Sequence, residues 1–507
     1  MTDGPLPHRA ALVCACGVLF LTFLDTTIVS VTLASVQSDL HAGVSALQWV
    51  VNAYTLTFAC LMLAAGALGD RIGHRRVMLA GLVVFVAGSW LAATATGVDR
   101  LILGRVVMGV GAAGSEPATL AVLRHLYPDA RQRARAIGTW AATSGLGLAL
   151  GPVLGGLLVG QWSWAAVFWF NFVAGILALV AVFVALPSTT VRHEGRVDLA
   201  GFSLSALALL CGVYGVIAGE TAGYDSGRVL ALFGASAVAL VAFVAVERRG
   251  RSPMLDPAYL RIPLVRGALV VAFAVYFGIF SIFFFTALYL QEVLAYSGGR
   301  LAGLFAPMAG GIIAAAVVTG RWLASTRARI PMVLGCVLGA AGIFLARGLL
   351  DEHPRFVPLM LALVVAGAGF GMAVVPLTAV VLGAAPRDQA GLAAAMTNTM
   401  RQVGAVIGVA TLGALVNAHL TSDLRHRLDA LGVPRGIQGI VTAAIEQGDV
   451  PTNGAPQATS TYGGIVQRVI GATFGAFRDG LHQSLLVAGA MMLLAGAYAW
   501  VTTRPRR

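Results

Sequence analysis

The sequence contains no lysine, and all 34 of its basic residues are arginine. Without lysine the chain cannot form the glycine-rich phosphate loop of ATP-hydrolysing proteins, whose lysine reaches the β- and γ-phosphates. The nine histidines show no metal-ligand spacing, and the five cysteines all lie in apolar runs, where they behave as small hydrophobic residues and not as a disulfide framework. These features exclude ATP hydrolysis, a metal site and a disulfide scaffold, and the sequence shows no other enzyme motif.

Charged residues are also scarce in this sequence. Only 11% of the 507 residues are charged and 58% are hydrophobic, with a mean hydropathy of +0.84. Such a chain is too apolar for a soluble protein and belongs to the integral membrane class. The formal net charge of +12 does not indicate a nucleic-acid partner, because the arginines lie in short loops between apolar runs and not on one basic surface.

The apolar runs are long and do not alternate with polar residues, which predicts membrane-spanning helices and not the strands of a barrel. The first run is too long for a signal peptide and is not followed by a cleavage pattern, so it is counted as a helix of the mature protein. Fourteen spans are predicted, near residues 10–36, 49–69, 77–97, 101–123, 134–159, 164–187, 199–219, 228–246, 266–290, 301–322, 331–350, 356–383, 389–416 and 481–502.

The distribution of arginine predicts the orientation of these spans. With the N-terminus inside, the inward segments hold 22 arginines and the short outward loops hold five. Since cytoplasmic loops retain positive charge, both termini are predicted to be cytoplasmic. Residues 418–480 then form an outward loop with an irregular middle, and the stretch 465–481 is expected to lead helically into the last span.

One short loop concentrates charge in an otherwise apolar region. The sequence "GALGDRIGHRR" between the second and third spans holds an acid, a histidine and three arginines. An ordinary cytoplasmic loop would explain the arginines but not the acid or the glycines. Glycines permit a tight turn and a close helix approach, and an aspartate at a helix end can accept hydrogen bonds from arginines or from another helix's N-terminus. The residues concerned are Gly66, Gly69, Asp70, Arg71, Gly73, Arg75 and Arg76.

This stretch resembles the cytoplasmic loop motif of the major facilitator superfamily, Gly-x-Leu-x-Asp-Arg-x-Gly-Arg-Arg. His74 stands where the family usually has a basic residue. The resemblance implies that the cluster latches the two halves of the molecule in an outward-facing state.

Four further segments resemble, in order along the chain, motifs of the drug:proton antiporters with fourteen helices. They are "LDTTIVSVTLASV" (24–36), "LILGRVVMGVGAAG" (101–114), "GLGLALGPVLGG" (145–156) and "NTMRQVGAVIG" (398–408). The third is similar to the antiporter motif of the fifth helix. Its glycines at four-residue spacing let another helix approach closely, and its proline disturbs the hydrogen-bond ladder. It contains Gly147, Gly151, Pro152, Gly155 and Gly156.

The resemblance implies an all-α integral membrane protein of the major facilitator fold, a monomer in the bacterial cell membrane. Two six-helix bundles, residues 1–187 and 263–507, would flank two inserted helices within 188–262. A shift of 254 residues places Gly66 on Gly320, Arg75 on Arg329 and Gly81 on Gly335, a weak internal repeat of the kind found in transporters.

Four ionisable residues fall inside predicted spans: Asp25, Arg105, Glu116 and Arg401. A charge there costs at least about 2.5 kcal/mol, which makes each of them a functional candidate. Asp25 lies about 22 Å from the inner start of its helix, and Arg105 lies about 6 Å from the outer edge of its own. In a hydrocarbon core of about 30 Å these depths nearly agree, so the two side chains are candidates for an ion pair.

Glu116 lies eleven residues after Arg105, on almost the same helix face and about 16 Å deeper. A carboxylate away from that arginine is costly to ionise and can exchange protons near neutral pH. The alternative is a protonated Glu116 that only hydrogen-bonds to a neighbouring helix. Arg401, near the middle of its span, either stabilises the second half through carbonyl groups or complements an acid across the cavity.

Aromatic and polar side chains are candidates for a substrate cavity, in which aromatic walls with a few acids suit lipophilic and often cationic solutes. The alternative is that the phenylalanines among the candidates face lipid and line no cavity. The candidates are Gln48, Trp49, Asn52, Tyr54, Phe283, Phe284, Phe285 and Tyr289.

These features predict a proton-coupled exporter of small lipophilic drugs or antibiotics that uses no cofactor and is driven by the proton gradient. Asp25, Glu116 or both would carry protons, with Arg105 tuning Asp25. Two alternatives stay open: a dedicated exporter of one metabolite, antibiotic or lipid, and a non-transporting membrane sensor or scaffold with the same fold.

Overall fold

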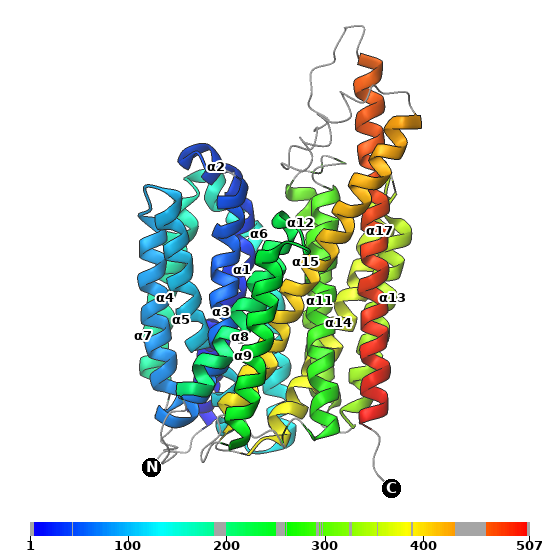
Figure 1. The fold of residues 1–507 in the computed structure, drawn as a ribbon. Helices are drawn as coiled ribbons and strands as arrows, with labels where there is room; N and C mark the ends of the chain where they lie inside the picture. Colours follow the sequence, from blue (N-terminus) through cyan, green and yellow to red (C-terminus); the bar gives the residue numbers. More distant parts are fainter. Residues whose placement is uncertain are drawn as a thin grey trace.

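The computed structural model shows a bundle of long helices whose axes are roughly parallel, with both termini at one end of the bundle (Figure 1). It describes residues 5–42, 44–186, 199–249, 259, 261–290, 294, 296, 298–323, 327–351, 353–386, 389–430 and 463–503.

The described helices fall into three sets in chain order. The first comprises α1 Pro5–Ile28, the 3₁₀ turn η1 Val29–Thr32, α2 Leu33–Leu40, α3 Val44–Ile72, α4 His74–Ala93, α5 Val98–Leu126, α6 Ala130–Gln161 and α7 Ala165–Ala185. The second comprises α8 Leu199–Ala222 and α9 Gly227–Arg249. The third comprises α11 Pro263–Leu288, α12 Gly298–Trp322, α13 Arg329–Leu349, α14 Phe356–Ala384, α15 Ala390–Ala430 and α17 Gly463–Thr502.

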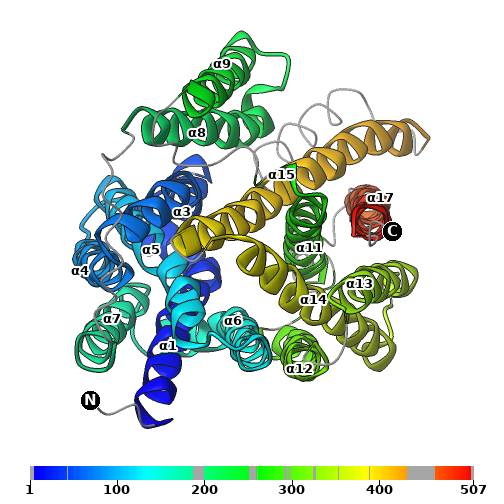
Figure 2. The same cartoon turned by 90° about the horizontal axis from the view of Figure 1, so that it is seen from below.

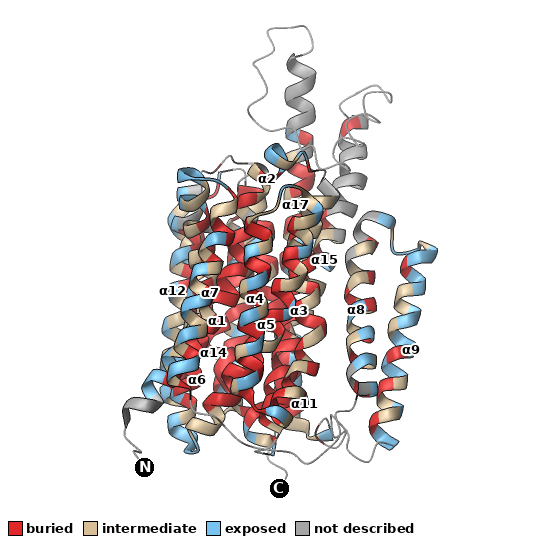
Figure 3. Ribbon diagram, turned by 90° about the vertical axis from the view of Figure 1, so that its left-hand side faces the viewer, coloured by how far each residue is buried: buried red, intermediate tan, exposed pale blue. Residues whose placement is uncertain are grey.

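The sets occupy different places when the molecule is viewed from the end that carries the termini (Figure 2). Helices α1 to α7 form one group, and α11 to α17 form a second group beside it. The pair α8 and α9 stands outside both groups, next to α3 and α15, and its separation from the main body is also visible in Figure 3.

Twelve helices within the described residues are long and apolar enough to cross a membrane. They are α1, α3 to α7, α9, α11 to α14 and α17. In α8 the shorter stretch Ser203–Val216 is apolar, and α15 is 41 residues long. The chain is therefore an all-helical, multi-pass membrane protein.

Local sequence accounts for several helix ends. Asp129 caps α6, because its Oδ1 accepts a hydrogen bond of 2.9 Å from the backbone N–H of Gln132. Pro263 stands in the first turn of α11, where its missing N–H has no intrahelical partner to lose. Gly73 alone separates α3 from α4 and has φ of 101°, a left-handed conformation that favours glycine.

Two sequence expectations need correction at helix boundaries. The first apolar run, residues 10–36, is not one α-helix, because η1 interrupts it between α1 and α2. The segment 418–480, expected as an outward loop, is helical at both ends, since α15 continues to Ala430 and α17 already begins at Gly463. The apolar periodicity of 465–481 indicated the second extension, whereas residues 418–430 are polar enough to suggest a loop. Residues 431–462 lie outside the described residues.

Small residues set the helix spacing in both main groups. Gly81 of α4 packs against α5 so closely that an added Cβ would lie 2.6 Å from the carbonyl oxygen of Gly111. Gly335 of α13 packs in the same way against α14, where a Cβ would lie 2.8 Å from the oxygen of Gly369. Gly81 and Gly335 are a pair related by the 254-residue repeat, so the repeat corresponds to equivalent helix contacts.

The two main groups share a continuous apolar core on the side of the termini. Leu120 and Leu123, at the end of α5 on this side, belong to a buried cluster that extends through α11, α13 and α14. Leu101 and Met108, nearer the other end of α5, belong to a cluster drawn only from the first group. Burial is concentrated where helices face one another within the bundle (Figure 3). The halves are thus packed together on one side of the membrane.

Candidate functional site

The Asp70 carboxylate joins the two halves on the side of the termini. Its Oδ1 accepts a hydrogen bond of 2.7 Å from the backbone N–H of Gly391, and its Oδ2 accepts one of 2.7 Å from Leu392. These N–H groups belong to the first turn of α15, which has no intrahelical acceptors for them and carries the positive end of the helix dipole. Asp70 therefore caps a helix that belongs to the other half.

The glycines of the same loop bring the two backbones together. A Cβ on Gly66 would lie 2.6 Å from the carbonyl oxygen of Gly391, so any side chain there would push α3 away from α15. A Cβ on Gly69 would lie 2.6 Å from Nδ1 of His74. Gly66 is therefore required by the contact between the halves, whereas Gly69 leaves room for the His74 side chain of its own loop.

The basic residues of the loop differ in their contacts and in their exposure to solvent. His74 is buried, and its Nε2 lies 3.2 Å from Oδ1 of Asp70, so the residue that departs from the family pattern touches the acid directly. Arg75 instead donates a hydrogen bond of 2.6 Å to the backbone oxygen of Phe183 and lies 5.4 Å from the centre of its ring. Arg71 is half-buried, and Arg76 is exposed.

Two more contacts close the same side. Gly138 of α6 and Gly320 of α12 face each other, and a Cβ on Gly320 would lie 2.9 Å from the carbonyl oxygen of Ala134. Arg124 at the end of α5 donates a hydrogen bond to the backbone oxygen of Ala385, just after α14. Because Gly320 is the repeat partner of Gly66, the two halves contribute equivalent glycines to the two contacts.

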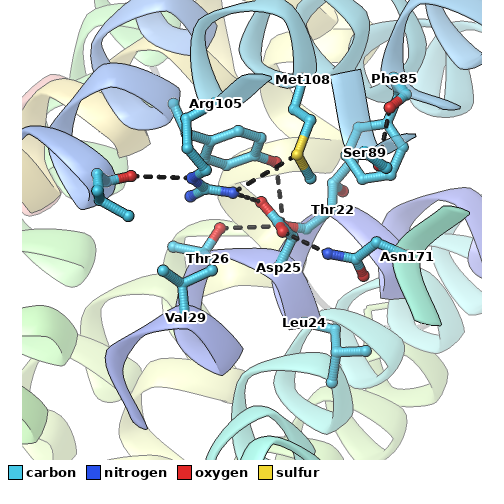
Figure 4. Close-up of polar contacts among 12 residues, drawn as sticks. Thr22, Leu24, Asp25, Thr26, Val29, Phe85, Ser89, Arg105, Met108 and Asn171 are labelled. Atoms are coloured by element: carbon cyan, nitrogen blue, oxygen red, sulfur yellow. Dashed lines mark hydrogen bonds and ion pairs between the residues drawn. The ribbon is translucent and has the colours of Figure 1, made fainter. Parts of the chain in front are cut away.

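Asp25 and Arg105 form an ion pair within the first group of helices (Figure 4). Oδ2 of Asp25 lies 2.6 Å from Nη1 of Arg105, and the two side chains are 0% and 1% exposed. Arg105 also donates from Nε to the backbone oxygen of Val50 at 2.9 Å, and its guanidinium lies 4.4 Å from the ring centre of Tyr54. The depths along α1 and α5 predicted this pairing.

Asn171 completes the surroundings of Asp25, and the sequence did not single it out. Its Nδ2 donates a hydrogen bond of 2.6 Å to Oδ1 of Asp25 (Figure 4). Both carboxylate oxygens are thus held by fixed donors, from α5 and α7. The available signal was one amide in the middle of "AAVFWFNFVAG", an otherwise apolar span that gives a polar side chain little reason to be there.

Glu116 lies on the same helix as Arg105 but in different surroundings. It is 1% exposed, and its Oε2 has no hydrogen-bond partner among the residues that the structure describes. The cation that attracts it is Arg401 of α15, which belongs to the other half. The two acids therefore differ: Asp25 is paired with a cation of its own half, whereas the cation that attracts Glu116 belongs to the other half.

Arg401 is held by neutral groups. It donates hydrogen bonds of 3.0 Å to Oδ1 of Asn398 and of 2.7 Å to Oγ1 of Thr378. Its guanidinium lies 4.9 Å from the ring centre of Trp140 and 5.3 Å from that of Tyr276. Trp140 comes from α6 and Tyr276 from α11, so this cluster spans the interface between halves.

A small hollow lies beside this cluster. Its wall is mostly apolar and comes from α6, α11, α12 and α14, so it lies between the two halves. It includes Ser144, Gly145, Tyr276, Ile279, Ile312 and Gly371. Tyr276 therefore contacts both Arg401 and the hollow.

The glycines of the fifth-helix motif lie on two different faces of α6: three of them face α1, and one is exposed. A Cβ on Gly147 would lie 2.9 Å from the carbonyl oxygen of Phe20, and one on Gly155 would lie 2.8 Å from that of Ile28. Gly151 likewise faces α1, at Thr27. Gly156 is exposed and has nothing within 4 Å of such a Cβ. The Pro152 side chain lies outside the described residues.

The other cavity candidates are scattered. Tyr54 is buried against Arg105, and its hydroxyl donates to the backbone oxygen of Thr22. Asn52 is half-buried on α3, and the Gln48 side chain lies outside the described residues. Tyr289 donates to the backbone oxygen of Asp351 and stacks on Phe477, both in the second group of helices.

The aromatic residues of α11 that the sequence proposed for the cavity do not share one environment, because their side chains point in different directions. Phe284 is 48% exposed, as expected of a lipid-facing ring, while Phe285 is buried and Phe283 packs on Phe305. Trp49 packs on Tyr214 of α8. These aromatic side chains do not gather in one cavity.

The geometry described above agrees with comparisons to known proteins. A family described as Major Facilitator Superfamily matches residues 15–409 of the chain. The chain is 30% identical over 489 residues to the multidrug resistance protein Stp of Mycobacterium tuberculosis, which covers 95% of this chain and 89% of the relative. It is 31% identical over 503 residues to the tetracenomycin C resistance and export protein of Streptomyces glaucescens, which covers 98% of this chain and 92% of the relative.

A solved structure supports the fold independently. The crystal structure of the human organic anion transporter MFSD10 (TETRAN) matches with a TM-score of 0.62 and covers 97% of this chain and all of that chain. At 15% sequence identity the likeness concerns the fold alone.

Proposed function

This chain belongs to the major facilitator superfamily, a family of transporters and not of enzymes, and we propose that it is a proton-coupled antiporter that exports lipophilic, often cationic drugs or antibiotics. The observation that carries the proposal is the pair of buried carboxylates, Asp25 and Glu116, inside the spans of a chain whose full-length relatives are named as resistance and export proteins. Buried acids in a membrane bundle mark ion and substrate pathways. Transport uses no cofactor and is driven by the proton gradient.

The proposed topology has fourteen membrane spans, with α8 and α15 crossing the bilayer in addition to the twelve most apolar helices. The 24 residues of α8 and its pairing with the apolar α9 support this count. Residues 1–187 and 263–507 form the two six-helix bundles, and 188–262 carry the inserted pair. Both termini face the cytoplasm of a bacterial cell, because the arginine-rich loops lie on their side. The transporter works as a monomer.

In this topology the closed side is cytoplasmic, and the described conformation is outward-facing. Asp70, with its hydrogen bonds to the start of α15, acts as the latch of that state. Alternating access requires the contacts of Asp70 with α15 and of Gly138 with Gly320 to separate together when the cytoplasmic side opens.

Protons enter from outside and leave inside. Glu116 exchanges its proton where the two halves meet, and this position links its charge to the arrangement of the halves through Arg401. Arg105 and Asn171 hold both carboxylate oxygens of Asp25, so a part for Asp25 in proton transfer requires that network to loosen. The structural alternative for Glu116, a protonated side chain that only packs, predicts no effect of its neutralisation on coupling.

Dye efflux tests the proposal. Cells of an efflux-deficient host that express the chain are expected to export ethidium, and Asp25→Asn and Glu116→Gln are expected to reduce efflux at least tenfold at equal expression. Asp39→Asn is the matched control, because Asp39 is exposed on α2. Unimpaired efflux in both Asp25→Asn and Glu116→Gln would reject the proposed roles.

A second candidate is a dedicated exporter of one compound. It is favoured by the name of the relative from Streptomyces glaucescens, which refers to a single antibiotic. A panel of chemically unrelated antibiotics separates the two, since resistance to several classes supports the multidrug function and resistance to one class supports the dedicated exporter.

A further inference from the structure

Asn171 presents one end of its side-chain amide to Asp25 and leaves the other end unused. Its Nδ2 donates a hydrogen bond of 2.6 Å to Oδ1 of Asp25, as Figure 4 shows, and the residue is 0% exposed. Among the residues that the structure describes, the Oδ1 atom of Asn171 has no hydrogen-bond partner. Buried polar atoms are nearly always hydrogen-bonded, so a spare acceptor beside a carboxylate requires an explanation.

The present orientation of the amide suits one protonation state of Asp25. An ionised carboxylate only accepts hydrogen bonds, so the amide of Asn171 must turn its N–H group toward it. A carboxyl group that has gained a proton carries an O–H donor and needs an acceptor in the same place. An asparagine amide holds a donor and an acceptor on one planar group, and the two exchange places when the amide rotates by half a turn.

Arg105 determines which oxygen of Asp25 is available to a proton. Its Nη1 donates to Oδ2 of Asp25 at 2.6 Å, and a guanidinium stays charged, so Oδ2 must remain an acceptor while the pair is intact. A proton is therefore left to Oδ1, the oxygen that faces Asn171.

The other neighbours of Asp25 do not hydrogen-bond to its carboxylate. Among the described residues, Arg105 and Tyr54 are the charged or titratable groups that face it. The hydroxyl of Tyr54 donates instead to the backbone oxygen of Thr22. Helix α6 packs on α1 through glycines, which bring no titratable group. An acceptor for a proton on Oδ1 has to come from Asn171.

Rotation of the Asn171 amide exchanges one hydrogen bond for another. In the described state an N–H group of Asn171 donates to ionised Asp25, and the amide oxygen is unpaired. After protonation and rotation, the O–H group of Asp25 donates to the amide oxygen, and the amide nitrogen is unpaired. The amide has nearly the same shape in both orientations, so the buried site does not have to repack.

We propose that Asn171 is a positioning residue that reverses its amide when Asp25 gains or loses a proton, so that both forms of the acid keep a partner inside the bundle. The inference rests on the proposed function and deepens it, because it names the group that lets Asp25 titrate while Arg105 stays bound. The proton moves between the transported pool and Oδ1 of Asp25. Asn171 donates or accepts a hydrogen bond and carries no proton itself.

Infrared difference spectra of the full-length protein in lipid bilayers, recorded between neutral and acidic pH, test the rotation. Asparagine labelled with ¹³C at the side-chain carbonyl marks the amide band, and the sequence contains only five asparagines. We expect the carboxylic acid band of Asp25 to appear together with a shift of one labelled C=O band to lower frequency, because a carbonyl bond weakens when it accepts a hydrogen bond. Both changes should be absent from Asp25→Asn, and the labelled shift should be absent from Asn171→Leu.

Ethidium-dependent proton flux in proteoliposomes gives a second readout. Asn171→Leu has a similar volume but no hydrogen-bonding group, and it is expected to lower the flux at least fivefold, whereas Asn171→Gln keeps an amide and should stay within threefold of the wild type. Ser89→Ala is the matched control, because Ser89 is also 0% exposed but its hydroxyl donates to the backbone of its own helix, at Phe85. Thermal unfolding identifies variants that fail to fold, and the labelled wild type then carries the test.

The outcomes separate this inference from the proposed function. If Asp25 gains a proton without a shift of the labelled band, or if Asn171→Leu moves protons as the wild type does, the inference is overturned and the antiporter stands. If no carboxylic acid band of Asp25 appears on acidification, the inference fails together with the part of Asp25 in proton transfer, and Glu116 remains as the proton carrier. If no compound moves protons in wild-type proteoliposomes, the antiporter itself fails.

Discussion

Asp70 and Leu392 are separated by 322 positions in the chain and joined by one hydrogen bond, 2.7 Å from the backbone N–H of Leu392 to Oδ2 of Asp70. The donor stands in the first turn of α15, and the acceptor stands at the end of α3. A carboxylate of the first half therefore binds the positive end of a helix that belongs to the second half.

Asp70→Asn is expected to shift the molecule toward the state that is open on the side of the termini. The amide loses the negative charge and one acceptor oxygen, and hydrogen bonds to charged groups contribute about 1.5–3 kcal/mol. Double electron–electron resonance between labels at positions 131 and 327, in a variant without the five native cysteines, should show a larger population at long distances. Both positions are exposed on this side.

Asp129→Asn is the control for this experiment, because Asp129 caps α6 inside its own half. It should leave the distance distribution unchanged. Equal distributions for Asp70→Asn and the wild type would show that Asp70 does not act as a latch.

Gly147→Ala and Gly156→Ala should differ although both lie in the same motif. A Cβ at Gly147 meets backbone atoms of α1 at 2.9 Å and 3.2 Å, so α1 and α6 must separate, at a cost of about 1–3 kcal/mol. Gly156 has open space and should tolerate alanine. Thermal unfolding in detergent, followed by dye efflux, measures both effects, and similar behaviour of the two variants would contradict the assigned helix face.

Arg105→Gln is expected to destabilise the protein by about 3–5 kcal/mol, because it leaves the Asp25 carboxylate buried without its cation. The double variant Asp25→Asn with Arg105→Gln should recover part of this loss, since both charges are then absent. Thermal unfolding measures the difference, with Arg100→Gln as the control on the same helix. A double variant as unstable as the sum of the two single variants would argue against direct pairing.

The sequence predicted best those features that depend on one helix at a time. Hydropathy located the twelve helices that are long and apolar enough to cross a membrane, and the glycine spacing identified the face of α6 that packs on α1. The depths of Asp25 and Arg105 followed from the rise per residue and the predicted orientation of their spans, so the two were candidates for an ion pair, which the structure contains. Asp70, at the end of α3, was expected to accept hydrogen bonds from arginines or from another helix's N-terminus, but the sequence did not indicate which helix.

Features that depend on how helices are rotated against one another were not predictable. Trp140, Tyr276 and Arg401 meet because three helices present particular faces to a common interface, and no spacing within one helix encodes that relation. Asn171 reaches Asp25 for the same reason. Tyr289 was a cavity candidate by composition, yet its hydroxyl bonds to the backbone of Asp351. The polar end of α15, residues 418–430, consists mostly of polar and charged residues, so its sequence resembled that of a loop although it is helical.

Proton movement in proteoliposomes tests the central claim most directly. When ethidium is added to vesicles that hold an imposed pH gradient and the wild-type protein, the gradient is expected to dissipate faster than in empty vesicles. Glu116→Gln is expected to abolish the ethidium-dependent proton flux while the protein remains folded. A Glu116→Gln variant that moves protons at the wild-type rate would contradict the account.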